Sequence, residues 1–218
     1  PGVPQGEINA LLVLPNGDIV VSGPFGNFAG VAGASWIARW RADSGGWSPM
    51  GSGLRGPVST FAISHSGALL AGGTFNTSNN VLIRGLGRWD EAAGTWATVG
   101  AGVSGSVQQV APLSDGRCFV RGSFTHREDP TVRNLALVDP DSGAWVGLPP
   151  PPAPPVNFAS NFVAAFSPQS DRLIFAGRQS GAGGSFTPTF EWDLSNNEWI
   201  NSGSGPENAQ SLPSGGWG

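Results

Sequence analysis

The sequence is poor in the residue types on which disulfide-bonded, metal-binding and nucleic-acid-binding proteins depend. Its 218 residues include no tyrosine, one cysteine, two histidines and no lysine. A single cysteine cannot form an intrachain disulfide, and two histidines without a His-x-His or His-Glu-x-x-His pair offer few ligands to zinc or copper. The 11 basic residues are all arginine and form no basic stripe, so we expect no nucleic-acid partner.

Charged residues and long apolar runs are also scarce. Charged side chains make up 12% of the chain, and the net charge is −4. No apolar run approaches the ~18 residues of a transmembrane helix, so we expect no membrane span. The Gly-x-x-x-x-Gly-Lys pattern of a phosphate-binding loop is missing as well.

The side chains that could catalyse a reaction do not form a recognisable set. His126 lies close to Glu128 and Asp129 in the sequence, but no spacing points to a Ser-His-Asp arrangement, and this pair of carboxylates is a poor cation site. The aspartates elsewhere recur singly in turns, where we interpret them as solvated turn residues. We therefore predict a non-catalytic protein with no cofactor and no metal site.

The chain is instead rich in glycine and tryptophan, which recur in a fixed order. An aromatic or apolar residue is followed seven positions later by a tryptophan four times: Trp40 to Trp47, Trp89 to Trp96, Val138 to Trp145, and Trp192 to Trp199. The second tryptophan advances by 49, 49 and 54 residues between repeats. A period near fifty residues built of short strands is typical of β-propeller blades. We expect the four second tryptophans to occupy equivalent, mostly buried positions.

Each repeat also has the same internal order of strand signals. An apolar stretch, a turn and a second short apolar stretch lead to a glycine, which comes fifteen residues after the start of the first stretch: Gly23, Gly73, Gly122 and Gly177. The predicted fold class is all-β: a β-propeller of four repeats of about 49–55 residues, each a four-stranded antiparallel blade. We place the blades at about residues 7–56, 57–105, 106–148 and 161–204.

These glycine and tryptophan positions resemble those of kelch and galactose-oxidase-type propellers. The chain is also similar to cell-surface propeller repeats, with Gly-x-Phe at Gly23, Gly73 and Gly122 and Trp-Asp at Trp89 and Trp192. The resemblance covers about residues 7–204 and implies a fold with little chemistry, because its landmarks are structural. The radical chemistry of galactose oxidase needs tyrosine, which this chain lacks.

A proline-rich insert, residues 149–155, separates the third and fourth repeats. Its prolines favour an extended polyproline II conformation, and a rigid surface excursion is the simplest interpretation. The insert also resembles the proline blocks of hydroxyproline-rich glycoproteins in green-algal walls and surface fibres. That resemblance implies modification of Pro149, Pro150, Pro151, Pro152, Pro154 and Pro155. A separate candidate glycosylation site is Asn76, in the sequon Asn76-Thr77-Ser78.

These patterns favour an extracellular structural or adhesive domain that binds other protein chains in a wall, fibre or surface assembly. The alternative is a carbohydrate-binding module, in which Trp36 and Phe28, outside the repeat landmarks, stack on sugar rings. A third hypothesis is a non-catalytic fragment of a larger propeller enzyme. Because residues 205–218 resemble the start of the first repeat, we expect a fifth repeat to begin there and the chain to be a segment of a longer array.

Overall fold

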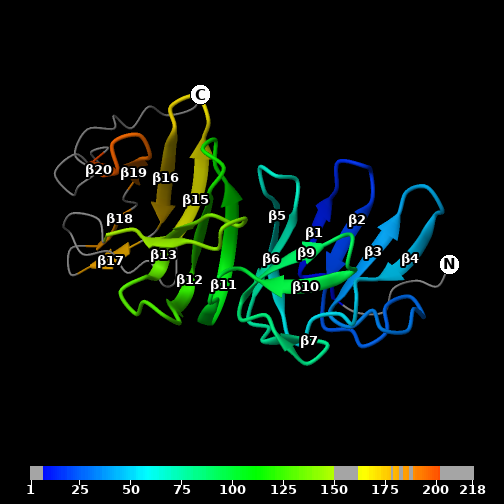
Figure 1. Cartoon of the computed structure of the whole chain (residues 1–218). Helices are drawn as coiled ribbons and strands as arrows, with labels where there is room; N and C mark the ends of the chain where they lie inside the picture. The colour runs from blue at the N-terminus through cyan, green and yellow to red at the C-terminus, as the bar shows by residue number, and fades with distance from the viewer. Residues whose placement is uncertain (1–6, 150–161, 178, 182–183, 187–188, 202–218) are drawn as a thin grey trace, which may run out of the picture. The chain divides into compact units, whose positions relative to one another are not determined.

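A computed structural model of the chain describes residues 7–149, 162–177, 179–181, 184–186 and 189–201 (Figure 1). The regular secondary structure of these residues consists of β-strands alone, as the sequence predicts. No helix that could cross a membrane is found in this part of the chain. The chain divides into two compact units, Pro1–Leu148 and Pro149–Gly218.

The first unit contains three four-stranded antiparallel sheets, numbered here in chain order. Sheet 1 consists of β1 (Ala10–Val13), β2 (Ile19–Ser22), β3 (Ile37–Arg41) and β4 (Gly46–Pro49). Sheet 2 consists of β5 (Val58–Ile63), β6 (Leu69–Gly73), β9 (Leu86–Asp90) and β10 (Thr95–Thr98), with the small hairpin β7 (Thr77–Ser78) and β8 (Val81–Leu82) between its second and third strands. Sheet 3 consists of β11 (Val103–Pro112), β12 (Cys118–His126), β13 (Arg133–Val138) and β14 (Trp145–Gly147).

The second unit contains sheet 4, which has the same strand order. Its strands are β15 (Phe162–Ser167), β16 (Arg172–Gly177), β19 (Thr189–Asp193) and β20 (Glu198–Asn201), and a small hairpin of β17 (Gln179–Gly181) and β18 (Gly184–Phe186) lies between the second and third. The prediction of four repeats of four antiparallel strands is confirmed. The predicted insert beyond Pro149 and the predicted fifth repeat at 205–218 lie outside the described residues.

In each sheet, the third and fourth strands form a hairpin, and the seven-residue spacing corresponds to the pairing register of that hairpin. The two residues of every pair lie directly opposite each other: Trp40 and Trp47, Trp89 and Trp96, Val138 and Trp145, and Trp192 and Trp199. Aromatic cross-strand pairs stabilise antiparallel sheets. The four second tryptophans are therefore equivalent in position, as predicted.

The burial of these tryptophans is less uniform than the repeat suggests. Trp96 is 3% exposed because it belongs to the core between sheets 1 and 2, whereas Trp47, Trp145 and Trp199 are half-buried. Trp47 lies on the face of sheet 1 directed away from sheet 2, where it packs with Phe28. The expectation of mostly buried positions is confirmed for all four, and Trp96 is the most deeply buried of them.

The repeated glycines are needed because the backbone at or just before the start of the first strand passes close to them. An added Cβ would collide with the carbonyl oxygen of Glu7 at Gly23, of Pro57 at Gly73 and of Ser106 at Gly122. The pairing register shifts beside two of these oxygens, between Val58 and Thr60 and between Val107 and Gln109. Such a β-bulge with a close backbone approach is a place where only glycine fits.

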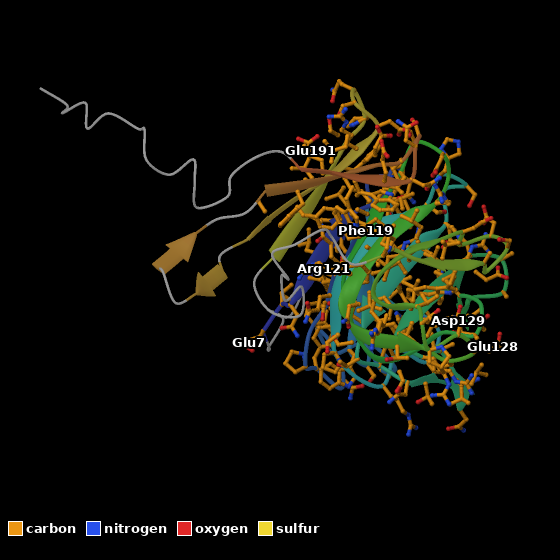
Figure 2. All side chains as sticks on the ribbon, turned by 90° about the vertical axis from the view of Figure 1, so that its left-hand side faces the viewer. Glu7, Phe119, Arg121, Glu128, Asp129 and Glu191 are labelled. Atoms are coloured by element: carbon orange, nitrogen blue, oxygen red, sulfur yellow. The ribbon has the colours of Figure 1, made fainter. Side chains whose placement is uncertain are left out.

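Within the first unit, the second strand of sheet 2, β6, is buried on both faces because sheet 2 packs between sheets 1 and 3. Val20 and Ile37 of sheet 1 share a core with Leu69 and Ala71 of sheet 2. The opposite face of sheet 2 contributes Leu70 and Leu86 to a second core with Cys118 and Val120 of sheet 3. The side chains that fill these layers are drawn in Figure 2.

Candidate functional site

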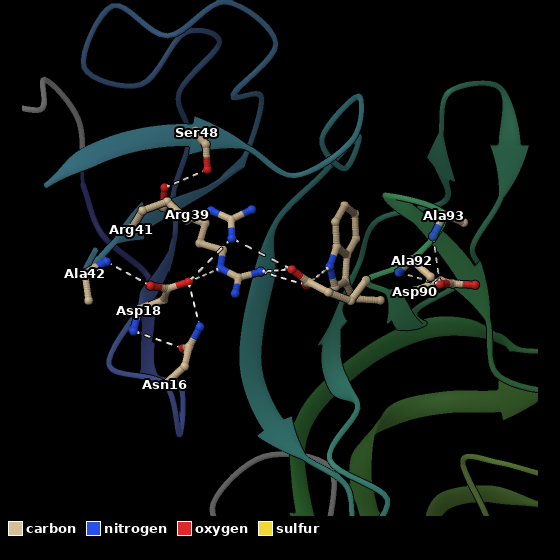
Figure 3. Close-up of polar contacts among 11 residues, drawn as sticks. Asn16, Asp18, Arg39, Arg41, Ala42, Ser48, Asp90, Ala92 and Ala93 are labelled. Carbon is tan, nitrogen blue, oxygen red and sulfur yellow. Dashed lines mark hydrogen bonds and ion pairs between the residues drawn. The ribbon is translucent and has the colours of Figure 1, made fainter. Parts of the chain in front are cut away.

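The largest polar cluster described in the first unit lies where hairpin turns of sheet 1 and sheet 2 come together. Its centre is Arg39 of β3, whose side chain is only 6% exposed. Arg39 Nε donates to Asp18 Oδ2 at 2.7 Å, and Arg39 Nη1 donates to Glu91 Oε1 and Oε2 at 2.8 and 2.7 Å (Figure 3). A nearly buried guanidinium is thus neutralised by a carboxylate from each sheet, as a buried charge requires.

Asp18 is fixed by its own turn as well as by Arg39. The backbone N–H of Ala42 donates to Asp18 Oδ1 at 2.8 Å, and Asn16 Nδ2 donates to Asp18 Oδ2 at 3.0 Å (Figure 3). The Ala42 hydrogen bond is the main influence that lowers the pKa of Asp18, and Asn16 and Arg39 act in the same direction. Asp18 is therefore ionised at neutral pH and serves as the anchor of Arg39.

Glu91 links the arginine to an aromatic ring. Trp89 Nε1 donates to Glu91 Oε2 at 2.7 Å, so the indole of β9 and the guanidinium of β3 share one carboxylate. Burial alone would raise the pKa of Glu91, but the hydrogen bonds from Trp89 and Arg39 outweigh it and lower the pKa. Glu91 is 59% exposed, so its carboxylate is held in place and still faces solvent.

A cleft of about 360 Å³ opens beside this cluster, between sheets 1 and 2. Trp89, Pro15 and Ile63 line it with apolar surface, and Asn16, Arg39 and Glu91 line it with polar groups. An apolar wall with a few fixed polar groups is the composition expected of a small-molecule binding site. The cleft is our candidate functional site.

The equivalent place between sheets 2 and 3 shows which part of the cluster is a repeated structural feature. Arg88, which like Arg39 precedes the first residue of a cross-strand pair, donates to Asp141 Oδ1 at 3.1 Å, and Ser66 Oγ donates to the same oxygen at 3.0 Å. The adjoining pocket of about 240 Å³ is lined by polar residues and by glycine, and no tryptophan or phenylalanine is among them. An arginine–carboxylate bridge thus joins both pairs of sheets, whereas the indole is particular to the first cleft.

The two predicted sugar-stacking residues lie in the loop between β2 and β3. Phe28 is 1% exposed because the loop folds back onto sheet 1 and packs this ring against Phe25 and Trp47, so it offers no face to a ligand. Trp36 is half-buried and has a positive φ of 62°. The structure therefore places Phe28 in the core and leaves Trp36 as the half-accessible member of the pair.

The predicted modification sites lie in exposed positions where they are described. Asn76 is exposed immediately before β7, and Ser78 of its sequon is buried, with Oγ donating to the carbonyl oxygen of Gly53 at 2.6 Å. Pro149 is exposed, and its carbonyl oxygen accepts a hydrogen bond from Trp199 Nε1 at 2.9 Å. Pro150, Pro151, Pro152, Pro154 and Pro155 lie outside the described residues.

The histidine and carboxylates singled out in the sequence form a local turn. His126 is buried, and its Nδ1 accepts a hydrogen bond from the backbone N–H of Asp129 at 3.1 Å. Glu128 and Asp129 are exposed in the loop after β12 (Figure 2). The side chain and backbone of Thr131 lower the pKa of Asp129 by hydrogen bonding to it. Within the described residues, no group of three or more His, Cys, Asp and Glu side chains is placed to hold a metal ion.

Sequence reasoning missed Trp89, Arg39 and Glu91 as a site. Trp89 served only as a structural landmark of the repeat, and the arginine and glutamate are 52 residues apart in the chain. Two signals were present. Arg-Trp occurs at the same place in the first two repeats, and Glu91 is one of only two glutamates between the paired residues, the other being Glu198 at the start of β20. Neither signal by itself shows that the two side chains meet.

Comparison with known proteins shows the fold and no family. No protein-family model matches the sequence, and no curated protein matches it. The structure is similar to that of the GH74 xyloglucanase from Xanthomonas campestris, with 16% identity and a TM-score of 0.55 over 89% of this chain and 29% of the xyloglucanase. It is also similar to an auxiliary nutrient binding protein from Bacteroides ovatus, with 11% identity and a TM-score of 0.54 over 89% of this chain and 41% of that protein. The chain therefore spans less than half the length of either protein.

Proposed function

We propose that the chain is an extracellular, non-catalytic β-propeller domain of the kelch type, which binds other protein chains in a surface or fibre assembly. The four sheets are its blades. The propeller arrangement is supported by β5, the first strand of sheet 2, which contacts the first strands of both neighbouring sheets, β1 and β11. First strands that lie next to one another are expected where blades surround a common centre.

The observation that carries the assembly proposal is an apolar face on sheet 1 that the other sheets of the first unit leave uncovered. Leu11 and Val13 of β1 are 59% and 58% exposed. Their equivalents in β5, Phe61 and Ile63, lie opposite Ala71 and Leu69 and pack against the core shared with sheet 1. The two positions whose side chains pack against a neighbouring sheet in sheet 2 are therefore exposed to solvent in sheet 1.

The partner that fits this face is a four-stranded sheet of the same repeat, supplied by another chain. The contact of β1 with β5 shows that first strands of adjacent sheets pack in this way. Burying the exposed surface of Leu11 and Val13 would contribute roughly 2–3 kcal/mol, at about 25 cal/mol per Å² of apolar area. Monomeric proteins seldom leave such a sheet face uncovered.

Sedimentation velocity tests the proposal. The unaltered chain should associate as its concentration rises, and the double variant Leu11→Ser/Val13→Ser should associate much more weakly. The control Val81→Ser/Leu82→Ser removes similarly exposed apolar side chains from β8 and should behave like the unaltered chain. A chain that stays monomeric at every concentration, or three proteins that associate equally, would refute this function.

The secreted location and the lack of catalysis are parts of the same proposal. The exposed sequon residue Asn76 and the fold shared with an auxiliary nutrient binding protein support an extracellular role. Carbohydrate recognition is a second candidate function. The cleft beside Trp89 favours it, and the fold shared with a xyloglucanase is compatible with it.

A further inference from the structure

We infer that the cleft between sheets 1 and 2 binds a neutral oligosaccharide, with the indole of Trp89 as its stacking surface. This site is separate from the apolar face of sheet 1, and it does not depend on the proposed assembly. It also differs from the site at Trp36 and Phe28 that the sequence suggests.

The ring of Trp89 is held rigidly in the wall of the cleft. Its Nε1 donates to Glu91 at 2.7 Å, and its ring centroid lies 5.2 Å from that of Trp96 in the core. A Cβ added to Gly51, in the loop after β4, would lie 3.5 Å from the six-membered part of the indole, so backbone also supports that edge. A ring fixed on several sides loses little conformational freedom when a flat ligand stacks on it.

Polar groups beside the ring match the hydroxyl groups of a sugar. The Glu91 carboxylate is ionised, partly exposed and fixed by Arg39, and its Oε1 accepts one hydrogen bond from Arg39, so a lone pair of Oε1 remains to accept a hydrogen bond from a hydroxyl group. Asn16 is exposed on the opposite rim, and its amide is oriented by hydrogen bonds with Asp18. An apolar platform flanked by oriented acceptors suits a molecule with an apolar ring face and a polar edge.

The charge balance of the cleft favours a neutral ligand. Two arginines, Arg39 and Arg41, face two carboxylates, Asp18 and Glu91, at ion-pair distances of 2.7 to 3.9 Å. With the charges paired, neither an anionic nor a cationic ligand gains a net attraction. The volume of about 360 Å³ lies at the lower end of the range for small-molecule sites, roughly 300–1,000 Å³, and suits a short oligosaccharide.

Titration calorimetry of the whole chain with cellotetraose and maltotetraose tests the inference, with a tetragalacturonate and a Pro-Pro-Pro-Pro-Ala-Pro-Pro peptide as comparison ligands. At least one neutral tetrasaccharide should bind, with an affinity that changes little between low and high salt. Trp89→Ala should weaken binding by about tenfold or more, which corresponds to about 1.4 kcal/mol. Trp36→Ala is the matched control and should leave binding unchanged.

Glu91→Gln is a second test variant in case Trp89→Ala fails to fold. The Glu91 side chain is largely exposed, and glutamine keeps the shape of the cleft. It should weaken saccharide binding several-fold in a protein with an unchanged circular dichroism spectrum. Lack of binding to both neutral saccharides, preference for the galacturonate or the peptide, or loss of binding in Trp36→Ala instead of Trp89→Ala would each overturn the inference. None of these results depends on whether the chain self-associates.

Discussion

Trp96→Ala is the substitution whose effect on stability the structure specifies most fully. Trp96 is 3% exposed and belongs to the core that contains Val20 and Ile37 of sheet 1 and Leu69 and Ala71 of sheet 2. Truncating a buried aromatic residue to alanine typically costs about 3–5 kcal/mol, because transfer energy is lost and a cavity remains. The tilted pair with Trp89 adds about 0.5–1.5 kcal/mol, so we expect a loss near the top of the first range.

Urea unfolding followed by far-ultraviolet circular dichroism measures this loss. Trp47→Ala is the matched control, since Trp47 holds the same register position on the face of sheet 1 directed away from sheet 2 and is half-buried. It should cost less than Trp96→Ala, because a smaller part of its side chain is removed from water. A loss below about 1 kcal/mol for Trp96→Ala, or equal losses for both variants, would refute the packing of sheets 1 and 2 described above.

Three further predictions follow from single positions. Gly122→Ala should lower the free energy of unfolding by about 1–3 kcal/mol in the same urea assay, because the added Cβ meets the Ser106 carbonyl. Gly26→Ala is the control and should be near neutral, because its added Cβ meets no atom. Equal losses for the two variants would contradict the close backbone approach at Gly122. Cys118 is buried, and burial raises the pKa of its thiol to about 12. A thiol reagent at pH 8 should therefore label only unfolded protein. Rapid labelling of folded protein would contradict the burial of Cys118. The lowered pKa values of Asp18 and Glu91 stabilise the fold above the pKa of the unfolded chain, about 4, and this stabilisation is lost as the pH falls through the lower folded values. Stability should therefore drop below about pH 4, and less steeply in Asp18→Asn/Glu91→Gln; parallel pH profiles would disprove it.

The repeat could be predicted from sequence because its landmarks are local. The pairing of Trp89 with Trp96 follows from hairpin geometry, in which a fixed spacing sets which residues face each other. Gly73 and Gly122 recur because the same backbone approach recurs in each sheet. Both features involve residues close together in the chain, and each repeat confirms the others.

The cleft could not be predicted in the same way. The contact of Arg39 with Glu91 joins segments 52 residues apart and depends on how far sheet 2 is rotated against sheet 1, which no spacing in the sequence records. Phe28 was a candidate stacking residue because it lies outside the repeat landmarks. Phe28 is instead buried against Phe25 and Trp47 by tertiary packing that is particular to this loop.

Hydroxyl-radical footprinting over a concentration series tests the assembly role most directly, because it reports the exposure of individual side chains. We expect oxidation of Leu11 and Val13 to fall as the chain associates, while oxidation of the similarly exposed Val81 and Leu82 stays constant. Associated protein in which Leu11 and Val13 remain as reactive as in the dilute monomer would contradict it.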